Sequence, residues 1–264
     1  MDDQYRYHSV DNVLMVTGDA SGIGVFCTTV ENSSRKFDTL FGPYSSYSTE
    51  NKYDVPGLSE LLAAKYEITK APGDKKVVDS VTGRDATFYI TEKDACPIGF
   101  SVDYALTEAE FMEIPQEQRA LTLMQAAIVD EDKLPEVGNV TLRAESGNLE
   151  YGESIDSLIK KTVSNRVHEF HRDSHGFTCL TSYDDNRLLY FTVPWSEGWK
   201  ATVDGVDTEV LNSGGMMALC ISAGEHQVEF SYHTPGFHAG IMISIISWCV
   251  FIIFTLIKVK SKTK

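Results

Sequence analysis

Three histidines form the nearest approach to a metal-binding pattern in this chain. His168, His171 and His175 have the spacing H-x2-H-x3-H. Imidazole nitrogens are common zinc ligands, but on a β-strand His168 and His171 would point to opposite faces and could not share one ion. On a loop the three rings could converge, yet the chain has neither zinc-protease motif. We therefore predict solvated histidines and no metal or cofactor.

Paired acidic residues beside turns could bind calcium. Asp204 and Asp207 flank Gly205, and Asp184 and Asp185 precede an asparagine. An EF-hand loop needs acids at alternating positions, a central glycine and a distal glutamate within about twelve residues, and neither stretch has this set. The chain also lacks a G-x-S-x-G nucleophile elbow. No catalytic residue can therefore be assigned from the sequence.

Four of the aromatic residues between positions 183 and 199 are the candidate binding residues. They are Tyr183, Tyr190, Trp195 and Trp199. Their rings could stack on sugar rings and bind a glycan, because large aromatic faces supply apolar contact while the phenol and indole groups hydrogen-bond. The same residue types also form the core of β-sandwiches, and the sequence leaves both roles open.

The segments around these aromatic residues have the pattern of antiparallel strands. Trp199, Ala201 and Val203 alternate with polar residues, as they do in a strand with one buried face. Asp204-Gly205 then predicts a two-residue hairpin. Several short strands at 8–12-residue spacing predict a β-sandwich. Further upstream, Ser154 is placed to cap a short amphipathic helix.

We expect a mainly β fold with a few helices (α+β), in which an antiparallel β-sandwich-like ectodomain precedes one C-terminal transmembrane helix. The first part of the chain mixes strand and helix patterns, including a helix that follows Pro115 and continues to Ile128. The acidic stretch at 130–139 is the best candidate for a boundary. The predicted units are a mixed lobe at 1–130, a sandwich lobe at 131–236, a membrane helix at 237–257 and a basic tail at 258–264.

The segment Ala239–Ile257 determines the class of protein. It contains no charge, proline or amide side chain over nineteen residues. As a helix it would be about 28 Å long, which matches the roughly 30 Å hydrocarbon core of a bilayer. A buried core helix is the alternative, but such helices usually carry a polar stripe. The segment is predicted to span a membrane.

Charges beside this segment predict the orientation. Four lysines and no acid follow it, at positions 258, 260, 262 and 264. The positive-inside rule therefore places the C-terminus in the cytoplasm and residues 1–237 outside it, in the cell membrane as a single-pass chain. The first twelve residues do not resemble a signal peptide. We therefore expect the chain to be the C-terminal piece of a longer polytopic protein.

Overall charge limits the partners. The chain has a formal net charge of −15, and the 38 acids face only 19 bases once the four tail lysines are set aside. Such a domain repels phosphate backbones, so nucleic acid is not an expected partner. Four cysteines precede the apolar segment, and their wide spacing favours buried thiols over disulfides. These are Cys27, Cys96, Cys179 and Cys220.

The last third of the chain resembles the end of the bacterial YfhO family of polytopic membrane proteins. The shared features are an ordered series of short motifs that ends at a membrane helix. In this sequence they are Pro194, Gly198-Trp199, Val203-Asp204-Gly205, Gly214-Gly215, Gly224-Glu225-His226 and Pro235-Gly236-Phe237. Earlier stretches also look similar, at Tyr5-Arg6, Leu61-Leu62, Lys65-Tyr66 and 97–100, so the resemblance covers nearly the whole chain.

This resemblance implies an accessory role in glycosylation of cell-envelope polymers, such as lipoteichoic acid, from lipid-linked sugars. The family is similar to polyprenyl-phosphate-sugar-dependent glycosyltransferases whose catalytic acid lies in an early external loop, and that part is absent here. The chain alone is thus not expected to turn over substrate, although whether it is an enzyme stays open. Implied partners are the bilayer, the missing helices, and an envelope glycan or lipid-linked sugar. The alternative is a structural or protein-interaction ectodomain with no glycan role.

Overall fold

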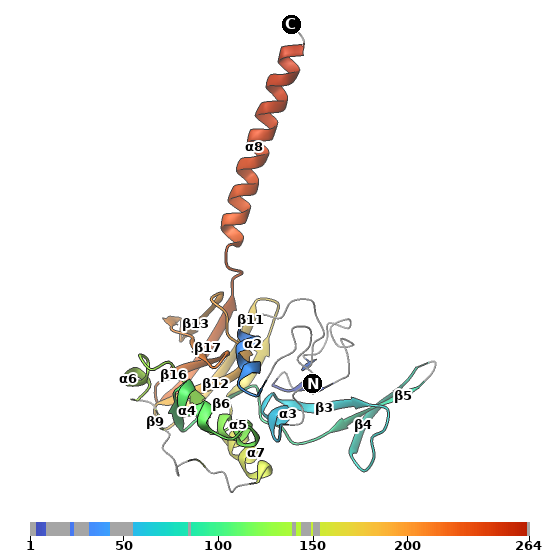
Figure 1. Cartoon of the computed structure of the whole chain (residues 1–264), viewed down its shortest axis with the longest axis vertical. Coiled ribbons are helices and arrows are strands. Elements are labelled where there is room, and N and C mark those ends of the chain that lie inside the picture. Colours follow the sequence, from blue (N-terminus) through green and yellow to red (C-terminus); the bar gives the residue numbers. More distant parts are fainter. Residues whose placement is uncertain are drawn as a thin grey trace.

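The protein consists of a β-rich body from which one long helix extends, as the computed structural model in Figure 1 shows. The structure describes residues 4–8, 22–23, 32–42, 55–83, 86–138, 141–143, 149 and 154–262. More of these residues lie in strands than in helices, and several sheets are antiparallel. The predicted fold class, mainly β with a few helices and one C-terminal apolar helix, is confirmed.

Two antiparallel sheets form the sandwich. One has the strand order β10-β11-β17-β13-β14 and the other has the order β15-β16-β12-β6. The bounds of the first sheet are β10 His168–Arg172, β11 Gly176–Tyr183, β17 Gly224–Tyr232, β13 Trp199–Val203 and β14 Val206–Thr208. Those of the second are β15 Leu211–Ser213, β16 Met216–Ile221, β12 Arg187–Pro194 and β6 Gly99–Val102.

The second sheet lies in the middle of the body, with both faces covered. On one face Phe191 packs against Phe177 and Phe230 of the first sheet, with ring centroids 5.6 and 5.0 Å away. On the other face Leu188 and Tyr190 belong to a second core shared with the helices. A strand buried on both faces needs apolar residues at successive positions, so β12 and β16 are nearly continuous apolar runs.

Short helices and a small parallel sheet cover that second face. The sheet has the order β8-β7-β9, with bounds Ala126–Ile128, Tyr104–Leu106 and Leu142–Arg143. The helices are α2 Asn32–Thr39, α3 Leu58–Leu61, α4 Glu108–Glu113, α5 Gln116–Leu123, α6 Leu134–Val137 and α7 Ile155–Ser164. Ser154 caps α7 as predicted, since its side chain accepts a bond from the Ser157 amide.

The predicted helix between Pro115 and Ile128 is shorter than expected. It ends at Leu123, and the chain then enters strand β8, which pairs in parallel with β7. Ala126, Ala127 and Ile128 are all buried. Their apolar run fits a helix face as well as a buried strand, and only the pairing with β7 decides between them.

The remaining sheet extends sideways from the body (Figure 1). Its order is β2-β1-β3-β5-β4, with bounds Gly22–Ile23, Arg6–His8, Ala64–Thr69, Thr87–Glu92 and Lys76–Thr82. Strands β4 and β5 form an arm in which every residue of β4 is exposed. The arm exposes large apolar side chains, namely Val77, Val78, Val81 and Phe88.

Contacts distant in sequence join the first and last parts of the chain. Strand β6 pairs with β12, so one sheet contains strands from both sides of residue 130. Arg6 is buried and donates hydrogen bonds to the Leu62 carbonyl and to the side chain and carbonyl of Thr192. The predicted division into lobes at residue 130 stays a prediction.

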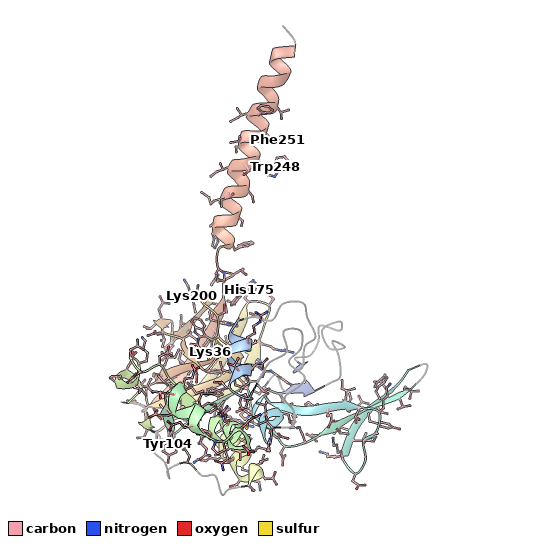
Figure 2. The ribbon with its side chains drawn as sticks, in the orientation of Figure 1. Lys36, Tyr104, His175, Lys200, Trp248 and Phe251 are labelled. Carbon is pink, nitrogen blue, oxygen red and sulfur yellow. The ribbon has the colours of Figure 1, made fainter. Side chains whose placement is uncertain are left out.

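Helix α8, Phe237–Lys262, leaves the body through a short linker. Residues Phe237–Thr255 have a mean hydropathy of 2.2 and none of that span is buried against the body. Gly236 has a φ of 77°, a left-handed conformation that favours glycine and turns the chain into the helix. Trp248 and Phe251 project from α8 away from any other element (Figure 2).

Three of the four predicted thiols lie in the described part of the body. Cys96 and Cys179 are buried and Cys220 is half-buried, and none of the three forms a disulfide. Cys27 lies outside the described residues. The prediction of buried thiols is confirmed for Cys96 and Cys179.

Candidate functional site

Two of the four predicted aromatic residues line one groove. Trp195 and Trp199 border an open groove of about 450 Å³ beside strands β13 and β14. The Trp195 indole donates to the Val210 carbonyl at 3.1 Å, and the Trp199 indole donates to the Pro194 carbonyl at 3.2 Å. Both rings are thus held in place by backbone, and both are half-buried.

Two local features position these rings. One is the end of β12, and the other is the close approach of the chain after β17 to Gly198. Near Pro194 the pairing of β12 with β16 shifts register, and the chain leaves the sheet at Trp195. A Cβ on Gly198 would lie 2.5 Å from the His233 carbonyl oxygen, so only glycine fits there. The close approach brings Trp199 against Tyr232, with ring centroids 5.2 Å apart.

The other two predicted residues lie elsewhere. Tyr190 is fully buried, with its ring 5.7 Å from that of Phe100, and offers no face to a ligand. Tyr183 is half-buried at the end of β11 and donates to the Asn165 carbonyl at 2.9 Å. Burial raises the pKa of Tyr183 to about 12. Of the four residues, therefore, only Trp195 and Trp199 share a surface.

Polar groups also line the groove. Ser196 and Thr208 contribute hydroxyls, and Glu197 and Asp207 contribute carboxylates. Glu209 is partly neutralised by Lys133, whose Nζ lies 2.6 Å from its carboxylate. Aromatic edges with hydroxyl and carboxylate acceptors are suited to a ligand rich in hydroxyl groups, because each hydroxyl can donate to an acceptor while its ring contacts an indole.

A second cluster, which the sequence did not reveal, joins the ends of β13, β16 and β17. Asp204 Oδ2 lies 2.7 Å from Nδ1 of His226, and Ser222 Oγ lies 3.0 Å from Nε2 of the same ring. Asp204 also accepts a bond from the Gln227 amide. The motifs V-D-G and G-E-H contain two of these residues, but only strand pairing brings them together.

This cluster has the residue types of a serine nucleophile site, but its hydrogen bonds favour a different role. Nε2 of His226 also lies 3.3 Å from the Ala223 carbonyl, which can only accept a proton. Nδ1 faces a carboxylate and acts as a donor, whereas Nε2 can donate to the Ala223 carbonyl when the ring is protonated or accept from the Ser222 hydroxyl when it is neutral. The hydrogen bond to Asp204 correspondingly raises the pKa of His226, and the bond to His226 lowers that of Asp204.

The cluster has no general base while His226 is protonated, because an imidazolium cannot accept the proton of a serine hydroxyl. It serves instead as a clip between the β13–β14 hairpin and the turn that precedes β17.

The three histidines with metal-like spacing are arranged differently from the arrangement that the sequence predicted. His168 and His171 lie on β10, while His175 lies in the next turn. A bulge between His168 and His171 places them opposite Leu180 and Thr178, which share one face of β11. They therefore lie on the same face and not on opposite faces, since the bulge adds one residue. Among the described residues no group of three potential ligands could hold a metal ion.

The β-sandwich body is followed by one exposed helix that is long and apolar enough to cross a membrane. Residues 148–244 match the family model described as bacterial membrane protein YfhO. The match extends from the segment before α7 through the sandwich strands into the first turns of α8. Residues 148–244 are therefore similar to the YfhO family of bacterial membrane proteins, which confirms the resemblance over that part of the chain.

The similarity of the stretches before residue 148 stays a prediction, because they lie outside that match. No curated protein and no solved structure matches the chain.

Proposed function

We propose that this chain is the membrane-anchored extracytoplasmic domain of a YfhO-type protein, with its C-terminus in the cytoplasm. The observation that carries the proposal is helix α8, whose Phe237–Thr255 span is strongly apolar and entirely unburied. Water would solvate such a helix poorly, whereas hydrocarbon would cover it. The lysines that follow the span, at positions 258, 260, 262 and 264, support the orientation.

The orientation is tested by labelling the two sides of the membrane in intact cells. Single cysteines replace Lys262 in the tail and Val206, which is 68% exposed in the body. The Val206→Cys variant should react with a membrane-impermeant maleimide and the Lys262→Cys variant should react only after permeabilisation. Cys27, Cys220 and Cys249 are replaced by Ser in both variants, so that the buried Cys96 and Cys179 are the other thiols that remain. Reaction of Lys262→Cys in intact cells would refute the orientation.

We further propose that the body acts as an accessory domain in envelope glycosylation, holding a glycan or lipid-linked sugar in the Trp195–Trp199 groove. Two indoles held by backbone hydrogen bonds, in a groove that hydroxyl and carboxylate groups also line, support this role. The rigid rings would lose little conformational freedom on binding. The reacting groups of any transferase would lie on other parts of a longer protein.

The glycan role is tested with the three tryptophans as probes. The indole N–H resonances of the full chain in lipid nanodiscs are followed while lipoteichoic-acid fragments and other envelope glycans are added. The resonances of Trp195 and Trp199 should shift, whereas that of Trp248, on the membrane helix, should not. Trp199→Phe should weaken binding and Trp248→Phe should leave it unchanged. If no envelope glycan shifts either groove resonance, the glycan role is wrong.

A second candidate function, protein interaction without a glycan role, is favoured by the β4–β5 arm. Val81 is 60% exposed and Phe88 is 39% exposed on the same face, in an otherwise polar and acidic domain. Exposed apolar clusters of this kind occur at protein interfaces. Crosslinking in cells should then capture partners that are lost in Val81→Ser but kept in Val206→Ser. Equal capture by both variants would remove this support.

A further inference from the structure

The end of the body nearest α8 is chemically unlike the rest of the domain. It comprises three segments, which we call the rim: Arg172–Gly176, Ser196–Lys200 and Tyr232–His238. Figure 2 shows His175 and Lys200 on the side of the body from which α8 extends. The rim contains two basic and two acidic residues, so it is formally neutral, and it holds three of the seven histidines. The residues before the basic tail, by contrast, have twice as many acids as bases.

Backbone hydrogen bonds hold the rim close to the start of α8. The Tyr232 amide donates to the His175 carbonyl at 2.7 Å, and the His233 amide donates to the Gly198 carbonyl at 2.8 Å. Only residues 234–236 separate this clamp from Phe237, and three residues span at most about 11 Å. The Phe237 amide donates back to the Thr234 carbonyl, so the linker is bent and its span is shorter.

This distance is comparable to the thickness of a headgroup layer. Each polar layer of a bilayer is roughly 5–8 Å thick, from the difference between the full bilayer and its hydrocarbon core. With α8 inserted as far as Phe237, the rim segments nearest the linker reach the lipid phosphates. The rim therefore occupies the layer that lies between the hydrocarbon and bulk water.

The side chains of the rim suit that layer. Tyr232 packs its ring on Trp199 and is 37% exposed, which is the amphipathic arrangement found at membrane interfaces. Lys200, His175, His233 and His238 are exposed and can donate to phosphate oxygens. The Asp173 carboxylate accepts from the amides of residues 175 and 176, which turns its charge toward its own loop. Glu197 is the acid of the rim that opposes contact with phosphate.

We propose that the rim is a docking surface for lipid phosphate headgroups, which fixes the body against the bilayer with Lys200 as its principal cation. A body held in this way would have one preferred orientation on the membrane, with the Trp195–Trp199 groove opening beside the headgroup layer. The proposal rests on insertion of α8 and does not depend on a glycan role.

The test is histidine labelling by diethyl pyrocarbonate, read by mass spectrometry, on the full chain in two environments. One is nanodiscs of phosphatidylcholine and phosphatidylglycerol, and the other is polyoxyethylene alkyl ether micelles, whose headgroups contain neither phosphate nor sugar. His175 and His233 should react more slowly in nanodiscs than in micelles. His168, on β10 but farther from α8, should react at the same rate in both and serves as the internal reference.

A charge reversal separates phosphate contact from simple crowding. Lys200→Glu should speed the labelling of His175 in nanodiscs by about fivefold, the effect expected of one basic residue near an anionic surface. The matched control Lys160→Glu, on α7, should leave it unchanged. Equal labelling of His175 in nanodiscs and micelles would overturn the proposal, as would an unchanged nanodisc rate in Lys200→Glu. Neither experiment contains a glycan, so failure of the glycan role would leave this result intact.

Discussion

Two apolar regions of this protein differ in what surrounds them. The central strands β12 and β16 are covered on both faces, by the first sandwich sheet and by the helical layer. Helix α8 is also strongly apolar, yet none of its Phe237–Thr255 span is buried against the body. The hydrophobic effect acts on both, since both remove apolar area from water. The difference lies in the environment that covers them, which is protein for the strands and, as we propose, lipid for the helix.

This comparison predicts that a core mutation destabilises only the body. Phe191 is fully buried between Phe177 and Phe230, so Phe191→Ala should lower the free energy of unfolding of the body by about 3–5 kcal/mol. Near-UV circular dichroism during urea unfolding of the full chain in nanodiscs measures this change. Val206→Ala, at an exposed position, is the control and should change it by less than about 0.5 kcal/mol. If Phe191→Ala also made the chain easier to extract from membranes, the stability of the body and the insertion of α8 would not be independent.

A mutation in α8 should, conversely, affect the helix and not the body. An aspartate at the centre of α8 should disfavour insertion by about 3 kcal/mol, so Ile246→Asp should reduce the membrane-inserted fraction. Carbonate extraction measures that fraction, with Ile246→Leu as the matched control. The body of Ile246→Asp should unfold at the same urea concentration as the wild type. Normal insertion of the Ile246→Asp variant would show that lipid is not the environment of the helix.

The clip between Asp204 and His226 predicts a smaller effect that depends on pH. The folded-state pKa of His226 is raised, so its contribution is complete below the unfolded value near 6.5 and is lost as pH rises through the folded value. The folded-state pKa of Asp204 is lowered, so its contribution is present above about 3.8 and is lost as pH falls through the lower folded value. Stability from the clip is therefore greatest between about pH 4 and 6.5.

Urea midpoints measured between pH 4 and 9 test this profile. The decline above pH 6.5 should be shallower in His226→Gln than in the wild type, and His168→Gln is the control on a histidine outside the clip. If the urea midpoint declined equally above pH 6.5 in His226→Gln and in the wild type, groups other than His226 would be responsible for the decline.

Tyr190→Phe should have the smallest effect. The Tyr190 hydroxyl is buried and has no hydrogen-bond partner among the described residues, so removing it should change the free energy of unfolding by less than about 1 kcal/mol. The matched comparison is Tyr183→Phe, which removes a hydrogen-bonded hydroxyl and should cost more. Urea unfolding of the two variants measures both changes. A larger loss in Tyr190→Phe would reveal a partner for that hydroxyl.

Features governed by neighbouring residues were predictable from the sequence. The Asp204-Gly205 turn needs two residues that tolerate positive φ, and both have it, at 52° and 80°. Ser154 caps α7 through a contact three residues away. The length and polarity of α8 are properties of one continuous segment, so predicting a helix long and apolar enough to cross a membrane needed no tertiary information.

Features that depend on residues distant in sequence were not predictable. Tyr190 and Trp195 are five residues apart and chemically similar, yet one is in the core and the other borders a groove, because β12 leaves the sheet between them. The bulge in β10 places His168 and His171 on one face of the strand, whereas the sequence predicted opposite faces. The pairing of β6 with β12 connects positions about ninety residues apart, which no local pattern encodes.

The sequence by itself thus determined the apolar C-terminal helix, the hairpin and the cap, because each depends on interactions within one continuous segment of chain. The tertiary structure alone decided which aromatic rings stay exposed, and which carboxylate holds His226. The physical reason is that burial depends on what packs against a residue, and the packing partners here come from segments far apart in sequence.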